Sequence, residues 1–160
     1  MDRQTQFRNH LAEGQVFKKD YIVLGTGILD GEPVSNAQIK IPLKTLNRHG
    51  LIAGATGTGK TKTLQVIAEQ LSLKGIPSVL MDLKGDLSGL AQAGTVSDFI
   101  LKRSETIGVS YDPQGLPVEL MSISNEKGVR LKATVSEFGP VLISQILELN
   151  DTQRGVVALV

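Results

Sequence analysis

The chain has 160 residues, enough for about one domain, with 41% hydrophobic residues, 21% charged residues and a formal net charge of +1. This balance is typical of a globular protein and gives no overall electrostatic reason to expect binding to nucleic acid or to a membrane. Because there is no cysteine, disulfides, a thiolate nucleophile and a cysteine-based zinc site are excluded, which fits a cytoplasmic protein, and no apolar stretch approaches the about 18 residues of a membrane span.

The first 46 residues are expected to form a small β lead-in to a nucleotide domain. A short helix fits before Gly14, because apolar residues recur there at a spacing of four. Residues 21–24 and 34–43 are strand candidates, and Asp30-Gly31 between them is a hairpin-turn signal. This segment therefore precedes the part of the chain that carries the chemistry.

That chemistry is predicted by residues 53–62, which read Ala-Gly-Ala-Thr-Gly-Thr-Gly-Lys-Thr-Lys and contain the phosphate-binding pattern Gly-x-x-x-x-Gly-Lys-[Ser/Thr]. In this pattern a strand ends, the backbone turns around a phosphate chain, and a helix begins with free N–H groups directed at the phosphates. Lys60 is placed to reach the β- and γ-phosphates as the catalytic cation, and Thr61 is placed to bind Mg²⁺. The predicted nucleotide contacts are Gly54, Ala55, Thr56, Gly57, Thr58, Gly59, Lys60, Thr61 and Lys62.

The residues on either side of this loop fit the same pattern. The apolar run at 51–53 is expected to end a buried strand, and the apolar spacing over 63–74 predicts a helix that stops at Gly75. A chance glycine-rich turn is the alternative, but the strand, the loop, the Lys-Thr pair and the capped helix all agree. The chain is therefore predicted to bind a nucleoside triphosphate.

A second apolar run, residues 76–82, ends in Asp82. An apolar strand closed by aspartate resembles a Walker B element, whose carboxylate holds Mg²⁺ through water. In RecA-like ATPases that strand comes much later and is often followed by glutamate, whereas Leu83 follows here. We therefore interpret the run as the second strand of the sheet, with Asp82 as a candidate metal contact at the ligand edge. A surface ion pair between Asp82 and Lys84 is the alternative.

The remaining elements are expected to alternate between helix and strand. Thr95 or Ser97 can cap a helix, residues 118–123 form a strand candidate, and residues 141–149 carry the spacing of a buried helix. Asp151 is expected to cap a last helix. Because that helix has no C-terminal stop signal, we interpret the chain as the N-terminal part of a longer protein.

Several stretches together resemble the start of the ATPase domain in bacterial HerA-like proteins of the HerA/FtsK superfamily. They are residues 47–61, 81–89, 91–94 and 130–155. The P-loop alone is common to many NTPases, but its combination with Asp-Leu-Lys-Gly-Asp-Leu-Ser-Gly at 82–89 is much more specific. The resemblance divides the chain into an N-terminal segment, 1–46, and the N-terminal part of a P-loop ATPase domain, 47–160.

The resemblance implies an α/β fold with a RecA-like P-loop NTPase core, a mostly parallel sheet and flanking helices. It also implies ATP and Mg²⁺ as cofactors, a homo-oligomeric ring such as a hexamer, and work on DNA as a translocase or helicase-type motor. The family's Walker B, sensor and arginine-finger residues are expected beyond this chain, so the chain by itself is expected to bind ATP with little hydrolysis. The alternative is a nucleotide-dependent assembly or regulatory module that moves no DNA.

Overall fold

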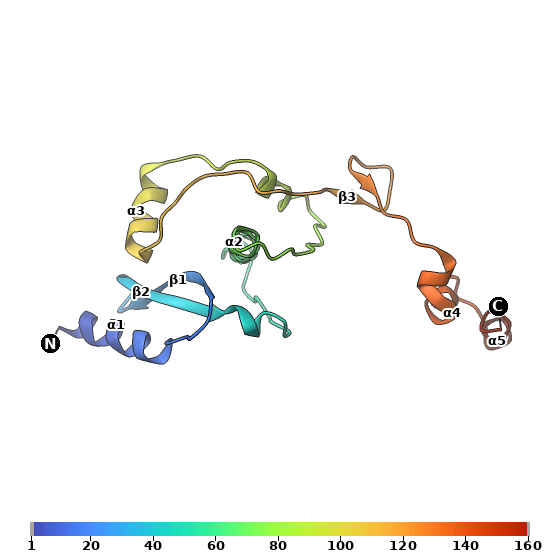
Figure 1. The fold of residues 1–160 in the computed structure, drawn as a ribbon, viewed down its shortest axis with the longest axis horizontal. Helices are drawn as coiled ribbons and strands as arrows, with labels where there is room; N and C mark the ends of the chain where they lie inside the picture. Colours follow the sequence, from blue (N-terminus) through green and yellow to red (C-terminus); the bar gives the residue numbers. More distant parts are fainter. Residues whose placement is uncertain (1, 160) are drawn as a thin grey trace. The chain divides into compact units, whose positions relative to one another are not determined.

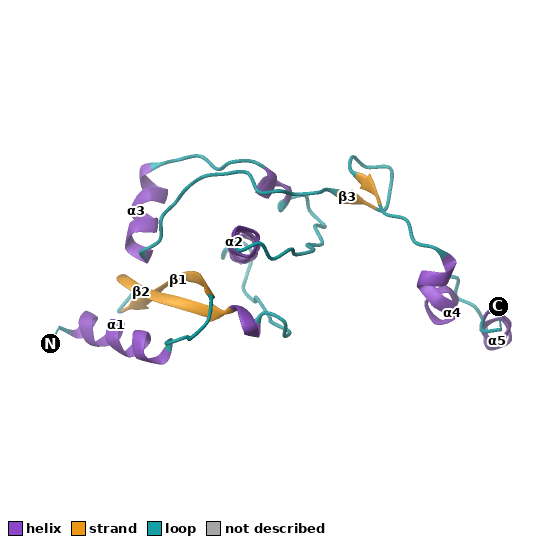
Figure 2. Ribbon diagram, in the orientation of Figure 1, coloured by secondary structure: helices purple, strands orange, loops and turns teal. Residues whose placement is uncertain are grey.

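The computed structural model describes residues 2–159. These residues fall into two compact units that meet between Val118 and Glu119 in the sequence. The elements, labelled in Figure 1 and coloured by type in Figure 2, are α1 (Arg3–Gly14), β1 (Tyr21–Leu29), β2 (Glu32–Pro42), η1 (Leu43–Thr45), α2 (Lys60–Leu73), η2 (Ser88–Ala91), α3 (Asp98–Ile107), β3 (Met121–Ser122), β4 (Val129–Arg130), α4 (Val135–Ile146) and α5 (Asp151–Val157). No helix within residues 2–159 is long and apolar enough to cross a bilayer.

An antiparallel hairpin of β1 and β2 organises the first unit. Asp30 and Gly31 connect the strands with φ angles of +53° and +86°, the left-handed conformation that matches the twist of a two-residue hairpin. The hairpin signal in the sequence is therefore confirmed. Ile22 on β1 and Val34 and Ala37 on β2 are buried, so the hairpin supplies most of the buried apolar residues of this unit.

Three glutamine side chains bind the helices to this hairpin. Gln70 of α2 pairs with the backbone of Val23 in β1, and Gln15, directly after α1, donates to the carbonyl oxygen of Gln38 in β2 at 3.1 Å. The Gln38 side chain in turn donates to the carbonyl oxygen of Gly108, at the end of α3, at 2.9 Å. Backbone groups of the strands and of the helix end thus receive hydrogen-bond partners from side chains. Figure 1 shows α1 on one side of the hairpin and α2 and α3 on the other.

Helix α2 ends where the sequence predicts. Gly75 has φ +71°, its N–H donates to Ser72 O at 2.9 Å, and the N–H of Ile76 donates to Leu71 O at 2.9 Å. These bonds satisfy carbonyl groups in the last turn of the helix. Gly75 itself has the left-handed backbone conformation that favours glycine.

The other helix starts follow local capping rules. Ser97, one of the two predicted candidates, caps α3, and the Thr134 and Glu137 side chains form a reciprocal capping box at the start of α4. In α5 the cap is Asn150, one residue before the predicted Asp151, which instead occupies the first helical position. Either residue type can accept a hydrogen bond at a helix start.

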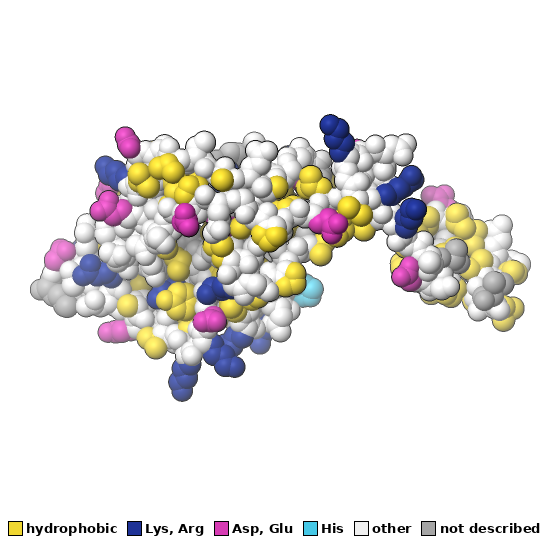
Figure 3. Space-filling model, turned by 45° about the horizontal axis from the view of Figure 1, so that its top comes forward, with side chains coloured by type: hydrophobic (Ala, Val, Ile, Leu, Met, Phe, Trp, Pro, Cys, Tyr) yellow, Lys and Arg dark blue, Asp and Glu magenta, His cyan; other side chains and the backbone are white. Residues whose placement is uncertain are grey.

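The expectation of a RecA-like core with a mostly parallel sheet is wrong. Among residues 2–159 the strands form only the antiparallel hairpin and a separate two-residue parallel pair, β3 with β4. Residues 51–53 and 76–82, expected to be core strands, form no strand, and Val79 and Met81 are 89% and 90% exposed. Figure 3 shows many such hydrophobic side chains at the surface. An apolar run favours burial, but it becomes a strand only where a neighbouring strand pairs with it, and here none does.

Candidate nucleotide-binding site

The predicted phosphate loop is a turn that leads directly into α2. Gly57 and Gly59 have φ angles of +81° and +95°, a left-handed conformation that strongly favours glycine. At a third glycine, Gly54, a Cβ would lie 2.5 Å from the Thr58 hydroxyl oxygen, so a larger residue there would displace the Thr58 side chain from its bond to Ala55 O. Glycine is therefore favoured at both glycine positions of the phosphate pattern, 54 and 59, and also at 57 between them.

The N-terminus of α2 is open to an anion. Its N-cap is Gly59, which has no side chain to cap the helix, and no acidic residue lies in the first turn. The helical hydrogen bonds begin with Thr63 N–H donating to Gly59 O at 2.9 Å, so the N–H groups of residues 60–62 precede the helical ladder. Together with the helix dipole and the charges of Lys60 and Lys62, they favour a negatively charged ligand.

In this structure the loop closes on one of its own carbonyl groups. Lys60 Nζ donates to Ala55 O at 2.6 Å, and the Thr58 hydroxyl donates to the same oxygen at 2.8 Å. The Lys60 ammonium group is therefore already turned into the loop. A phosphate oxygen, which carries more negative charge than a carbonyl oxygen, is a stronger partner for that ammonium group.

Thr61, the predicted Mg²⁺ ligand, lies next to a carboxylate. Its hydroxyl donates to Asp86 Oδ2 at 3.2 Å, and Gln65 Nε2 donates to the backbone carbonyl of Asp86 at 2.8 Å. Thr61 and Gln65 are four residues apart, so they lie on one face of α2. The sequence prediction did not include Asp86. Asp86 is the second aspartate of the Asp-Leu-Lys-Gly-Asp stretch, so the sequence shows a carboxylate there. Because it lies 25 residues from Thr61, no local pattern predicts that the two side chains meet.

Asp82, the other predicted metal contact, organises the turn that follows it. Its Oδ1 accepts the N–H groups of Lys84, Gly85 and Asp86 at 3.2, 2.8 and 3.2 Å, and its Oδ2 accepts that of Leu87 at 2.9 Å. These bonds, the one from Leu87 most of all, hold the pKa of Asp82 below its ordinary value. The carboxylate next to Thr61 is that of Asp86, and a metal contact by Asp82 stays a prediction.

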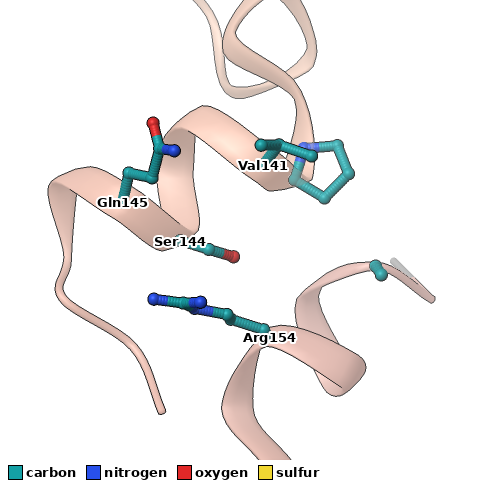
Figure 4. Close-up of a pocket in the computed structure, with 6 residues that line it drawn as sticks. Val141, Ser144, Gln145 and Arg154 are labelled. Carbon is teal, nitrogen blue, oxygen red and sulfur yellow. The ribbon is translucent and has the colours of Figure 1, made fainter. Parts of the chain in front are cut away.

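Two shallow surface hollows lie away from the phosphate loop. One is lined by Lys19, Asp20, Leu43 and Lys44. The other lies between α4 and α5 and is lined by Pro140, Val141, Ser144, Gln145, Arg154 and Ala158. Figure 4 shows the Arg154 side chain extending beneath Ser144, and Arg154 Nε donates to Leu149 O at 2.9 Å. Neither hollow contains a predicted nucleotide contact.

Comparison with known proteins shows a family match over most of the chain. The family model of the helicase HerA-like C-terminal domain matches residues 28–160, from within β1 through the phosphate loop and the Asp82 turn. No curated protein and no solved structure matches. A bacterial source, an N-terminal place in a longer protein and the division at residues 46 and 47 stay predictions. Since the match covers most of the chain, the protein belongs to the HerA-like helicase C-terminal family, a family of HerA/FtsK-type ATPases.

Proposed function

We propose that the loop from Gly54 to Lys62 binds the phosphates of ATP together with Mg²⁺. We further propose that the intact protein hydrolyses ATP as a HerA-like DNA translocase or helicase-type motor in a homo-oligomeric ring. The observation that supports nucleotide binding is the uncapped N-terminus of α2, where residues 60–62 present N–H groups behind the left-handed Gly59. Family membership supports the motor.

Each residue of the loop has a distinct task in this proposal. The backbone N–H groups from Gly57 to Lys62 hold the phosphate chain, and the Lys60 ammonium group exchanges the Ala55 carbonyl for a phosphate oxygen. Lys60 then stabilises the charge that develops on the transferring phosphoryl group. The Thr61 hydroxyl oxygen, a hard ligand of the kind that Mg²⁺ prefers, binds the metal. When bound, Mg·ATP would supply the phosphoryl group, and its metal would neutralise negative charge on the phosphates.

Equilibrium binding of a fluorescent ATP analogue tests the nucleotide site. The double variant Lys60→Ala/Thr61→Ala should bind at least about tenfold more weakly, since each lost charge-assisted bond is worth about 1.5–3 kcal/mol. Lys74→Ala removes the same charge at the opposite end of α2 and should bind like the wild type. Undiminished affinity of the double variant would contradict the proposal.

The motor is tested separately, by the ATPase activity of the intact protein with and without DNA. A DNA motor should be stimulated by DNA, and the stimulation should weaken as salt rises, because salt competes for the phosphate contacts. Normal ATP binding with no stimulation by any DNA, at any salt concentration, would instead favour nucleotide-dependent assembly without DNA movement.

A further inference from the structure

Asp86 is outside the phosphate-binding pattern, yet it is held against the helix that carries Thr61. Its N–H donates to Asp82 Oδ1 at 3.2 Å and its carbonyl oxygen accepts from Gln65 Nε2 at 2.8 Å. With its backbone held on both sides, its Oδ2 accepts a hydrogen bond from the Thr61 hydroxyl, with 3.2 Å between the two oxygens. The carboxylate therefore has a defined position at the start of α2, although the residue is exposed.

The direction of this hydrogen bond determines what the Thr61 oxygen can do. A threonine hydroxyl has one proton to donate and two lone pairs to offer. When the hydroxyl donates a hydrogen bond to Asp86, its hydrogen points away from any cation that Thr61 binds, and the lone pairs are left for that cation. A carboxylate that accepts a hydrogen bond from a metal ligand in this way orients the ligand and makes its oxygen a better electron donor.

A purely stabilising role explains the hydrogen bond between Thr61 and Asp86 less well than a role in metal binding does. The turn is already joined to α2 through the Gln65 bond to the carbonyl oxygen of Asp86, which any residue at position 86 could keep. An exposed side-chain hydrogen bond adds little to the free energy of unfolding. A carboxylate next to a metal-binding hydroxyl, by contrast, adds negative charge close to where a divalent cation is to be bound.

We propose that Asp86 is a positioning residue for the metal: it orients the Thr61 hydroxyl toward the Mg²⁺ of bound Mg·ATP. This inference rests on the proposed nucleotide site. It differs from the prediction for Asp82, because the acting carboxylate is the one hydrogen-bonded to Thr61. It assigns Asp86 no contact with the nucleotide itself, so its effect should depend on the metal.

The test separates metal binding from nucleotide binding. Affinity for a fluorescent ATP analogue is measured for the intact protein in excess chelator and across a Mg²⁺ titration, and Mn²⁺ binding to the protein–nucleotide complex is followed by electron paramagnetic resonance. Asp86→Ala should leave the affinity in chelator unchanged and raise the half-saturating metal concentration by about 10-fold or more. Asp86→Asn keeps the shape and one acceptor oxygen, so it should show a smaller shift. Asp112→Ala, at an exposed loop aspartate, should match the wild type.

A double-mutant cycle shows whether Asp86 acts through Thr61. In a Thr61→Ala background, Asp86→Ala should cause little further loss of metal affinity, because the hydroxyl that it orients is gone. The inference is overturned if Asp86→Ala and Asp86→Asn keep the wild-type metal dependence, or if the loss in Asp86→Ala is undiminished without the Thr61 hydroxyl. If the wild type binds no nucleotide with or without metal, the proposed function itself fails and this inference fails with it.

Discussion

The side-chain amide of Gln70 forms two hydrogen bonds with the backbone of a single residue, Val23. Gln70 Oε1 accepts the Val23 N–H at 2.7 Å, and Gln70 Nε2 donates to the Val23 carbonyl oxygen at 2.6 Å. The amide thus provides the hydrogen bonds that a further strand would provide at the edge of β1. It also anchors α2, with Lys60 and Thr61 at its N-terminus, to the hairpin.

Gln70→Ala should therefore lower the free energy of unfolding by about 1–3 kcal/mol, because it removes two hydrogen bonds and leaves two half-buried backbone groups without these partners. The measurement is urea unfolding followed by circular dichroism. Gln92→Ala, at an exposed glutamine, should change stability by no more than about 0.5 kcal/mol. Equal stabilities of the two variants would show that the bonds to Val23 do not hold the helix.

Two glycines at opposite ends of α2 allow backbone strain to be separated from ligand binding. Gly59 and Gly75 have φ angles of +95° and +71°, and a Cβ at either would meet nothing within 4 Å. Alanine at each should cost about 1–2 kcal/mol of stability, from the left-handed backbone alone. Only Gly59→Ala should also weaken ATP binding, because its methyl group stands where the phosphates are proposed to lie. Thermal unfolding and analogue binding of both variants measure the two effects. Equal losses of binding would contradict the assignment of Gly59 to the phosphate loop.

The Asp82 turn should make stability depend on pH. Backbone N–H groups, that of Leu87 above all, lower the pKa of Asp82 below 3.8, so the folded state favours the ionised carboxylate. The resulting stability is present above the unfolded-state pKa and is lost as the pH falls through the folded-state pKa. Asp82→Asn should thus be less stable than the wild type near neutral pH, since its amide nitrogen cannot accept the N–H bonds made to one oxygen. The difference should shrink as the pH falls below 3.8.

Thermal unfolding of the two proteins over a pH series measures this dependence. Asp112→Asn, at an exposed loop aspartate, controls for the loss of one negative charge. A difference between the wild type and Asp82→Asn that stays constant from neutral to acid pH would show that the Asp82 carboxylate does not stabilise its turn.

The hairpin turn, the end of α2 and the cap of α3 could be predicted because each depends on residues close in sequence, whereas α4 begins at Val135, ahead of the predicted helix at 141–149. Asp30 and Gly31 tolerate the left-handed turn, Gly75 ends α2, and Ser97 caps α3, each through the conformation or hydrogen bonding of a few neighbouring residues. The conformation of the phosphate loop likewise depends on residues close in sequence. Its glycines and the start of α2 at Lys60 lie within one short segment, so its spacing alone predicts an uncapped helix N-terminus.

By itself, the sequence determined these local elements, and its resemblance to HerA-like proteins agrees with the family match; the nucleotide site that it predicts stays a prediction. The tertiary structure alone decided that residues 51–53 and 76–82 do not pair as strands, and that the Thr61 hydroxyl meets Asp86 rather than Asp82. The reason is that strand pairing and side-chain contacts join residues far apart in the chain. Hydrophobic periodicity reports how a segment prefers to be buried, but it does not specify which distant partner is there to receive its hydrogen bonds.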